Sequence, residues 1–141
     1  MPDDYRLERF VAAQDERGTY DGALAELRNG RKQGHWMWFV FPQIAGLGSS
    51  PMAQHYAISS LAEAQAYVGH PVLGPRLREC CTALLDLPAS DPVQVLGHVD
   101  AMKLRSSMTL FGRATPNEPV FGQVLDKYYG GDPDDATLAR L

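Results

Sequence analysis

Apolar side chains recur at intervals of three and four residues along most of the chain, the spacing of helices that bury one face. The pattern predicts a first helix that is capped by Asp3 or Asp4 and ended by Gly18. A second helix follows between Thr19, which can cap it, and Gly30, which can end it. The start of the chain is therefore predicted to form two short helices.

Capping residues mark the starts of the later helices. A long stretch with an apolar stripe begins after His70-Pro71 and ends near Leu87. The pattern over Asp100–Phe111 predicts another helix, with Met102 among its buried residues. The predicted caps are Ser50, Ser60, Asp91, Asn117 and Asp134.

The stretch Gly34–Gln43 is apolar on all sides, so its periodicity does not distinguish a buried strand from a buried helical turn. Its aromatic and β-branched content favours a strand. No second strand is available to pair its backbone groups, and we therefore expect a short buried helix. The whole pattern predicts an all-α fold, a compact bundle of about seven or eight short helices that forms a single domain over residues 1–141.

Composition and charge exclude several classes of protein. Of the 141 residues, 45% are hydrophobic and 21% are charged, which is enough apolar surface to build a core. The net charge is −4, with short basic clusters only at 28–32 and 76–78, so we expect no nucleic-acid partner. The longest apolar run, Trp36–Pro42, is too short to cross a bilayer, and no signal peptide is evident. We expect no membrane partner and a cytoplasmic location.

The cysteines Cys80 and Cys81 are adjacent, which disfavours a disulfide between them and gives no metal-ligand spacing. We expect two free thiols on a helix, one buried and one near the surface, in a reducing compartment. The histidines also lack ligand spacing, and the acidic residues at 132–135 do not match a calcium loop. The sequence therefore predicts no metal and no cofactor.

Two stretches carry unusual polar residues, and the first is Gly34–Gln43. Trp36 and Trp38 each bring a polar N–H group that needs a partner. One interpretation is an aromatic pocket wall, with Gln43 as a polar contact and His35 as a general acid–base group. The other is that the aromatic rings belong to the core and that His35 is satisfied within the fold. The residues alone leave both interpretations open.

The second stretch is the helix predicted over Asp100–Phe111. Helical spacing places Asp100, Lys103 and Ser107 on one face, with the first two as a weak surface ion pair. Serines in the middle of a helix compete for backbone partners, so they must be satisfied by a ligand or by each other. The stretch fits an anion cradle, a Ser–Lys nucleophile pair, or internal hydrogen bonds between helices. The candidate polar contacts are Lys103, Arg105, Ser106, Ser107 and Thr109.

The loop Gly46–Ser50 leads into a predicted helix, where free backbone N–H groups are able to hold an anion. It lacks the lysine and the length of a Walker loop and is not followed by a βαβ pattern. An ordinary Gly-Ser loop is the simpler interpretation.

Segments along nearly the whole chain carry a family resemblance: Arg9–Gln14, Tyr20–Leu27, Gly34–Gln43, Gly46–Ser49, Tyr56–Ile58, His70–Leu77 and Asp100–Phe111. They resemble a bacterial domain-of-unknown-function family numbered eighteen-ten, whose type is a mostly helical mycobacterial protein of about this size. The His-Trp-Met-Trp run at 35–38 is the most specific of them. The resemblance covers nearly the whole chain and implies an all-helical domain with no established activity. Members are sometimes labelled calpastatin, but a calpain inhibitor of that type is a disordered repeat protein, unlike this apolar-rich, non-repeating chain.

Two functions from different classes fit these observations. In the first, the two polar stretches share one pocket for a nucleotide-like or other phosphorylated small molecule, with His35, Asp100 or Lys103 as catalytic groups. In the second, the protein is a non-catalytic helical module that binds another protein, and the same residues build its core. A shared concave site that contains both stretches would favour the first hypothesis.

Overall fold

The computed structural model describes residues 5–141, and every regular element in that range is helical. It confirms the all-α prediction, with ten α-helices and one 3₁₀ helix in place of the seven or eight helices expected. Several of the helices are single turns. The elements are α1 (Glu8–Asp15), η1 (Glu16–Gly18), α2 (Thr19–Arg28), α3 (Met37–Val40), α4 (Pro51–His55), α5 (Leu61–Gly69), α6 (Leu73–Asp86), α7 (Pro92–Leu96), α8 (His98–Ala114), α9 (Val120–Tyr129) and α10 (Asp135–Leu138).

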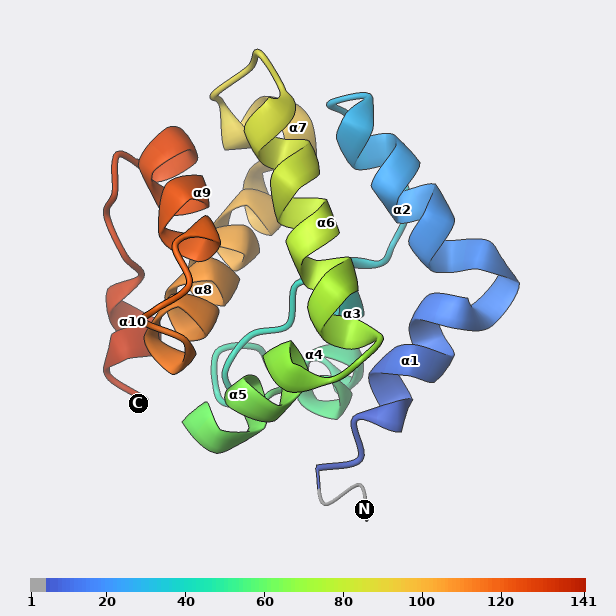
Figure 1. The fold of residues 1–141 in the computed structure, drawn as a ribbon, viewed down its shortest axis with the longest axis vertical. Helices are drawn as coiled ribbons and strands as arrows, with labels where there is room; N and C mark the ends of the chain where they lie inside the picture. The colour runs from blue at the N-terminus through green and yellow to red at the C-terminus, as the bar shows by residue number, and fades with distance from the viewer. Residues whose placement is uncertain (1–4) are drawn as a thin grey trace.

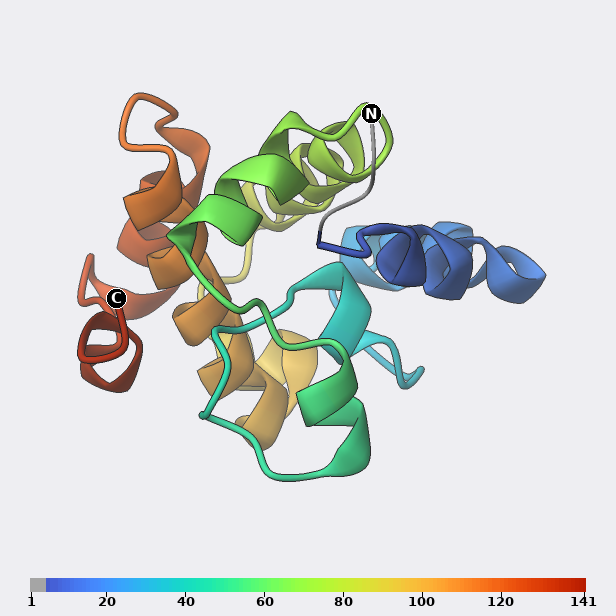
Figure 2. The same ribbon diagram turned by 90° about the horizontal axis from the view of Figure 1, so that it is seen from below.

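The two longest helices, α6 and α8, form the middle of the molecule (Figure 1). Helix α8 packs against α5, α7, α9 and α10, and α6 packs against α2, α5 and α9. Helices α1 and α2 lie on one side of this pair, while α9 and α10 lie on the other. Figure 2 shows the connection from α3 through α4 to α5 passing across one end of α8.

Helix α8 contributes buried apolar residues to the core from several of its faces. Leu104, Met108 and Phe111 recur at intervals of four and three residues and are fully buried. The Phe111 ring lies 5.2 Å from the ring of Tyr67 on α5 and 5.7 Å from the ring of Phe121 on α9. Aromatic pairs at such distances add to the hydrophobic gain and hold the three helices together.

A buried glutamine attaches α3 to its neighbours. The Nε2 of Gln14 donates to the carbonyl of Phe39 over 2.7 Å and to the Tyr67 hydroxyl over 3.2 Å. The Gln14 Oε1 accepts from the Arg76 guanidinium over 3.2 Å. Since buried polar groups stabilise only when they are paired, this network fixes the short α3, the expected buried helical turn, in one position.

Four of the predicted caps are confirmed. The side chains of Ser50, Ser60, Asp91 and Asp134 each accept a hydrogen bond from a backbone N–H in the first turn of the following helix, over 3.0 to 3.2 Å. These local signals require no tertiary structure, because the cap and the N–H group lie within three residues of each other.

Two predicted caps are wrong. Thr19 is the first residue of α2, and its hydroxyl donates to the Glu16 carbonyl over 2.6 Å instead of accepting from the helix. Helix α9 begins only at Val120, after Pro119, so Asn117 does not cap it. The predicted caps at positions 3 and 4 lie outside the described residues.

Two burial predictions are also wrong. Met102 is 64% exposed, because it lies two positions before the buried Leu104 and hence about 200° away around the helix. Cys80 and Cys81 are both free and both fully buried, although one was expected near the surface. Adjacent positions on α6 are both enclosed because the helix is covered on several sides by α2, α5 and α9.

The 44–58 segment is a loop that is closed at its base. Ile44 and Ile58 form an isolated parallel bridge, supported by Ala45 N to the Ile58 carbonyl over 2.8 Å and by Ile58 N to the Gln43 carbonyl over 2.9 Å. Both isoleucines are buried. The loop, which includes α4, therefore projects from a fixed base beside α8.

None of the helices within residues 5–141 combines the length and the apolar character needed to cross a membrane.

Candidate functional site

One carboxylate anchors the start of the 33–43 segment to α2. The Glu26 Oε1 accepts hydrogen bonds from Gln33 N over 2.7 Å, from Gly34 N over 2.8 Å and from Trp36 Nε1 over 3.0 Å. Burial raises the pKa of Glu26, but the hydrogen bonds from Gly34, Gln33 and Trp36 outweigh it, so the net pKa is lowered. The ionised carboxylate thus satisfies the indole N–H and fixes the backbone that leads into α3.

Trp36 lies inside the protein. Its side chain is only 2% exposed, with the Lys32 ammonium 5.1 Å from its ring centroid and the Phe41 ring 6.4 Å away. A cation over an indole is favourable when both are shielded from water. Trp36 is thus enclosed by protein groups, and it packs behind the groove without lining it.

Lys32 connects the two polar stretches, although sequence reasoning did not single it out. Its ammonium group lies 2.7 Å from Asp100 Oδ2 and donates to the Gly34 carbonyl over 2.6 Å. The side chains of Lys32 and Asp100 are 8% and 19% exposed, so this ion pair is largely shielded from solvent. The pair therefore attaches the 33–36 segment to the start of α8.

Lys103 lies at the edge of the same cluster. Its ammonium group is 3.7 Å from Asp100 Oδ1 and 5.0 Å from the ring centroid of Trp38, and its side chain is 22% exposed. The candidate residues Trp36, Trp38, Asp100 and Lys103 therefore lie close to one another, and Lys32 contacts two of them, Trp36 and Asp100. Because Asp100 is held more closely by Lys32, the charge of Lys103 is only partly balanced within the protein.

A groove of about 440 Å³ opens beside Lys103. The 43–53 segment forms one wall, α8 forms the second, and residues 134 and 136 complete it. Gln43, Lys103 and Ser106 are the candidate residues that line this space, which we call the Lys103 groove. The structure thus brings parts of both polar stretches to one concave surface.

Other polar residues of α8 contact the C-terminal segment. The Arg105 guanidinium donates to the carbonyl and the carboxylate of Asp132, over 2.9 and 2.6 Å. The Ser106 hydroxyl donates to Asp134 Oδ2 over 2.8 Å, and Thr109 Oγ1 accepts from Asp134 N over 2.9 Å. Three of the five candidate contacts on this helix thus make internal hydrogen bonds, which was one of the interpretations left open.

His35 and Ser107 are two of the candidate residues that do not line the groove. His35 is exposed on the surface of the 33–36 segment and is not among the groove-lining residues. Ser107 is fully buried, and its hydroxyl lacks a hydrogen-bond partner among the described residues. An unpaired buried hydroxyl is unfavourable, so Ser107 is a local weakness in the packing of α8.

The residues that complete the cluster carried little signal in the sequence. Lys32 stood out only as part of the short basic cluster at 28–32, and Glu26 carried no signal. Asp134 was predicted as a helix cap, which it is, but not as part of the groove wall. Lys32 and Asp134 act through contacts with α8, and Glu26 acts through contacts with the 33–36 segment beyond the end of its own helix, so the spacing within one helix does not reveal them.

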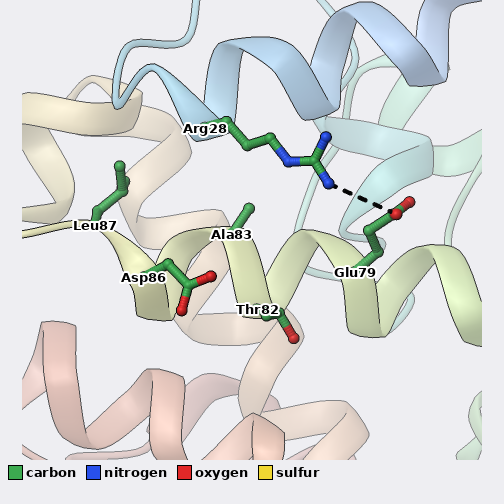
Figure 3. A pocket seen from close by; sticks show the side chains of 6 residues that line it. All are labelled: Arg28, Glu79, Thr82, Ala83, Asp86 and Leu87. Atoms are coloured by element: carbon green, nitrogen blue, oxygen red, sulfur yellow. Dashed lines mark ion pairs between the residues drawn. The ribbon is translucent and has the colours of Figure 1, made fainter.

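A second cavity, of about 330 Å³, lies between α2 and α6. Figure 3 shows Arg28 reaching from α2 towards Glu79 on α6, with Thr82 and Asp86 further along the same helix. The Arg28 and Glu79 charges are 3.8 Å apart, and their side chains are 62% and 47% exposed. Because an exposed ion pair contributes little energy, and because no candidate residue lines this cavity, it is the weaker site.

Comparisons with known proteins agree with the helical architecture. The crystal structure of the conserved hypothetical protein Rv1873 from Mycobacterium tuberculosis superposes with a TM-score of 0.95 and is 52% identical in sequence, covering 99% of this chain and 98% of that one. No curated protein matches the chain. The family described as "Protein of unknown function (DUF1810)" matches residues 4–141, which confirms the resemblance seen in the sequence. The chain belongs to this family.

Proposed function

We propose that the protein binds a small phosphorylated molecule with a ring or other apolar portion, such as a nucleotide, in the Lys103 groove. The observation that carries the proposal is the position of the Lys103 ammonium group. It lies at the border between the Trp38–Asp100 cluster and the groove, where its neighbours hold it in position to meet a ligand that enters the groove.

The charges around the groove favour an anion at Lys103. Lys32 lies 2.7 Å from Asp100, whereas Lys103 lies 3.7 Å from the same carboxylate, so Lys32 supplies the main counter-charge of Asp100. The groove carboxylate, Asp134, is already hydrogen-bonded to Ser106 and Thr137. A phosphate at Lys103 would gain a charge-assisted hydrogen bond, which is stronger than a neutral one.

The remaining lining of the groove is suited to the apolar part of such a ligand. Leu47 and Ala53 on one wall face Val99 and Met102 on the other, while Gln43 provides an amide. Ligand sites usually combine apolar walls with a few polar groups that fix the orientation. The groove has this composition.

We propose binding without a catalytic role for the candidate acid–base residues. His35 lies outside the groove lining, and Asp100 is held by two lysines. A general base must reach the proton that it removes, and neither side chain is free to do so at Lys103.

A protein partner is the second candidate function. Val99 and Met102 lie one turn apart on α8 and are 65% and 64% exposed, so they form an apolar edge of the groove. Exposed apolar residues of this kind are frequent at interfaces. Substitution of Met102 with Glu would weaken a protein complex through that edge, whereas a phosphate held at Lys103 would be affected far less.

The test is a thermal-shift and calorimetric screen of nucleotides and sugar phosphates. A ligand at about one hundred times its Kd stabilises the folded state by about 2.7 kcal/mol. For a chain of 141 residues this corresponds to a rise of about 9 °C in Tm. Adenosine monophosphate and adenosine form the first matched pair of probes, because they differ only in the phosphate.

The matched variants are Lys103→Met, Lys103→Arg and Arg113→Met. We expect Lys103→Met to weaken binding of the phosphate compound at least about tenfold, and Lys103→Arg to retain most of it. Arg113 is exposed on the same helix outside the groove, so its variant controls for net charge. If no phosphorylated compound raises Tm, or if Lys103→Met binds as tightly as the wild type, the proposal is wrong and the protein-partner function is favoured.

We also propose a cytoplasmic location. Cys80 and Cys81 are free thiols in the core, and a reducing compartment keeps such thiols unpaired.

A further inference from the structure

The C-terminal segment leaves the apolar core after α9. Among the described residues, the core has its last member at Tyr128, and Tyr129 is the last apolar side chain that packs against it. The segment 130–141 adds no apolar residue to that core. In Figure 1 the connection from α9 to α10 runs along the outer edge of the molecule, and α10 then lies beside α8. The segment is therefore attached to the bundle without an apolar side chain of its own in the core.

Polar contacts with α8 hold the segment in place. Arg105 binds the backbone and the carboxylate of Asp132, and it also donates to the Pro133 carbonyl over 3.0 Å. The carboxylates of Asp132 and Asp135 are on the solvent side of the segment. Hydrogen bonds of this kind exchange readily with water, so each contributes little net stability.

Asp134 makes the densest set of these contacts. Its Oδ2 accepts from the Ser106 hydroxyl over 2.8 Å, from Thr137 N over 3.2 Å and from the Thr137 hydroxyl over 2.5 Å. Its own N–H donates to Thr109 Oγ1 over 2.9 Å. One carboxylate thus both caps α10 and ties it to α8, and Thr137 is fully buried beneath it.

The same segment forms part of the groove. Asp134 and Ala136 line it together with Lys103. At the other end of the segment, the Arg140 guanidinium lies so close to Gly46 that a Cβ there would be 2.7 Å from Arg140 Nη1. The segment therefore contacts α8 on one side of the groove and the 44–58 loop on the other.

Two consecutive glycines connect α9 to the C-terminal segment. Gly130 and Gly131 have φ angles of 63° and 81°, in the left-handed region that other residues enter only at a cost. Two consecutive glycines also have access to many other backbone conformations, so the connection is able to rotate. Rotation here would move the whole segment, and it would break the hydrogen bonds from Gly131 N to the Leu125 carbonyl, over 3.0 Å, and from Asp132 N to the Tyr129 carbonyl, over 3.1 Å.

We propose that residues 132–141 form a hinged flap that opens and closes the Lys103 groove independently of the core, with Gly130-Gly131 as the hinge and Asp134 as the latch. The role of this opening, ligand entry and release, rests on the proposed function. The motion itself requires no ligand, so it is tested separately.

The first test is hydrogen exchange of the full chain, followed by mass spectrometry. Amides that open locally exchange faster than amides that require global unfolding. We expect peptides from 132–141 to exchange at least about tenfold faster than peptides from α8 and α9. Equal protection of the flap and α8 would mean that they unfold as one unit, and the flap would be rejected.

The second test measures access to Lys103. Acetylation of its amine by an N-hydroxysuccinimide ester, quantified by peptide mapping, reports how often the groove is open. We expect Asp134→Ala to accelerate labelling at least about threefold, because the latch is lost. Asp135→Ala, which removes the exposed neighbouring carboxylate, should leave the rate unchanged.

The outcomes separate the two proposals. If Asp134→Ala fails to fold, Arg105→Met tests the same flap through its contacts with Asp132 and Pro133. Equal labelling of Lys103 in Asp134→Ala and Asp135→Ala overturns the latch, whatever the groove binds. If the flap opens as expected but adenosine monophosphate and related phosphates do not bind, the phosphate proposal fails while the flap stands.

Discussion

Replacement of Asp100 by Ala tests whether the cluster beneath the groove is built around its ion pair. The substitution removes the carboxylate that lies 2.7 Å from Lys32 and 3.7 Å from Lys103. Lys32 is then left with its ammonium group inside the protein, where its side chain is 8% exposed. Its remaining contacts are the Gly34 carbonyl at 2.6 Å and the Trp36 ring at 5.1 Å.

The magnitude follows from the burial of the pair. Removal of one partner from a fully buried ion pair costs about 3–5 kcal/mol, because the other charge stays desolvated. Here Asp100 is 19% exposed and Lys32 keeps a carbonyl partner, so we expect a loss of about 2 kcal/mol in the free energy of unfolding. With an unfolding entropy of about 0.3 kcal/mol/K for 141 residues, Tm falls by about 7 °C.

The assay is a double-mutant cycle by urea and thermal unfolding. Asp100→Ala is measured in the wild-type background and in Lys32→Met, where no buried ammonium group remains. We expect the cost of Asp100→Ala to fall below about 0.5 kcal/mol in the second background, since the two positions then no longer interact. Lys103→Met serves as the control, with a loss of less than about 1 kcal/mol expected from its long and more exposed ion pair.

Two results would refute this reasoning. One is a change of less than about 0.5 kcal/mol in the free energy of unfolding for Asp100→Ala alone, which would mean that the Lys32–Asp100 ion pair contributes no net stability. The other is an equal cost in both backgrounds, which would mean that Asp100 acts through contacts other than Lys32.

Two further predictions concern titratable groups. Burial raises the pKa of the Cys80 thiol to about 12 and also raises that of Cys81, so Ellman's reagent at pH 8 should label the folded protein only as fast as it unfolds; a rapid burst would contradict this. The lowered pKa of Glu26 means that its contribution to stability is fully present above the unfolded-state value of about 4.3 and is lost as the pH falls through the lower folded-state value. Glu26→Gln should therefore flatten the acid limb of a stability–pH curve measured by urea unfolding, and an unchanged limb would rule out the carboxylate as its source.

Local chemistry explains which features were predictable. The caps at Ser50, Ser60, Asp91 and Asp134 were predicted correctly because each side chain meets a backbone N–H group a few residues further on. The failure at Asn117 has a tertiary cause. Glu118 is held by Arg78 on α6 through two hydrogen bonds of 2.7 and 2.9 Å, and the chain turns there before α9 begins.

The residues of the candidate site also divide into those that local sequence predicts and those that depend on tertiary contacts. Trp38, Asp100 and Lys103 were selected for their residue types and do lie close together, whereas Lys32 was missed because its partner Asp100 comes from a distant helix. Arg105 was predicted as a ligand contact, but the structure shows it bound to the 132–133 backbone, a contact that no spacing within α8 reveals. Polar residue types indicate where partners are needed, while the tertiary fold decides which partners they find.

The parallel bridge between Ile44 and Ile58 gives the protein a place at which new recognition properties can be grafted. Both ends of the intervening loop are fixed by backbone hydrogen bonds and by buried isoleucines, and Leu47 and Tyr56 pack against the core, so the exposed residues 49–52 are the part of the loop that is free to change. Exchange of residues 49–52 would change the shape and polarity of one groove wall and leave the bundle as it is. The fold therefore offers a scaffold for binders with selected loop tips.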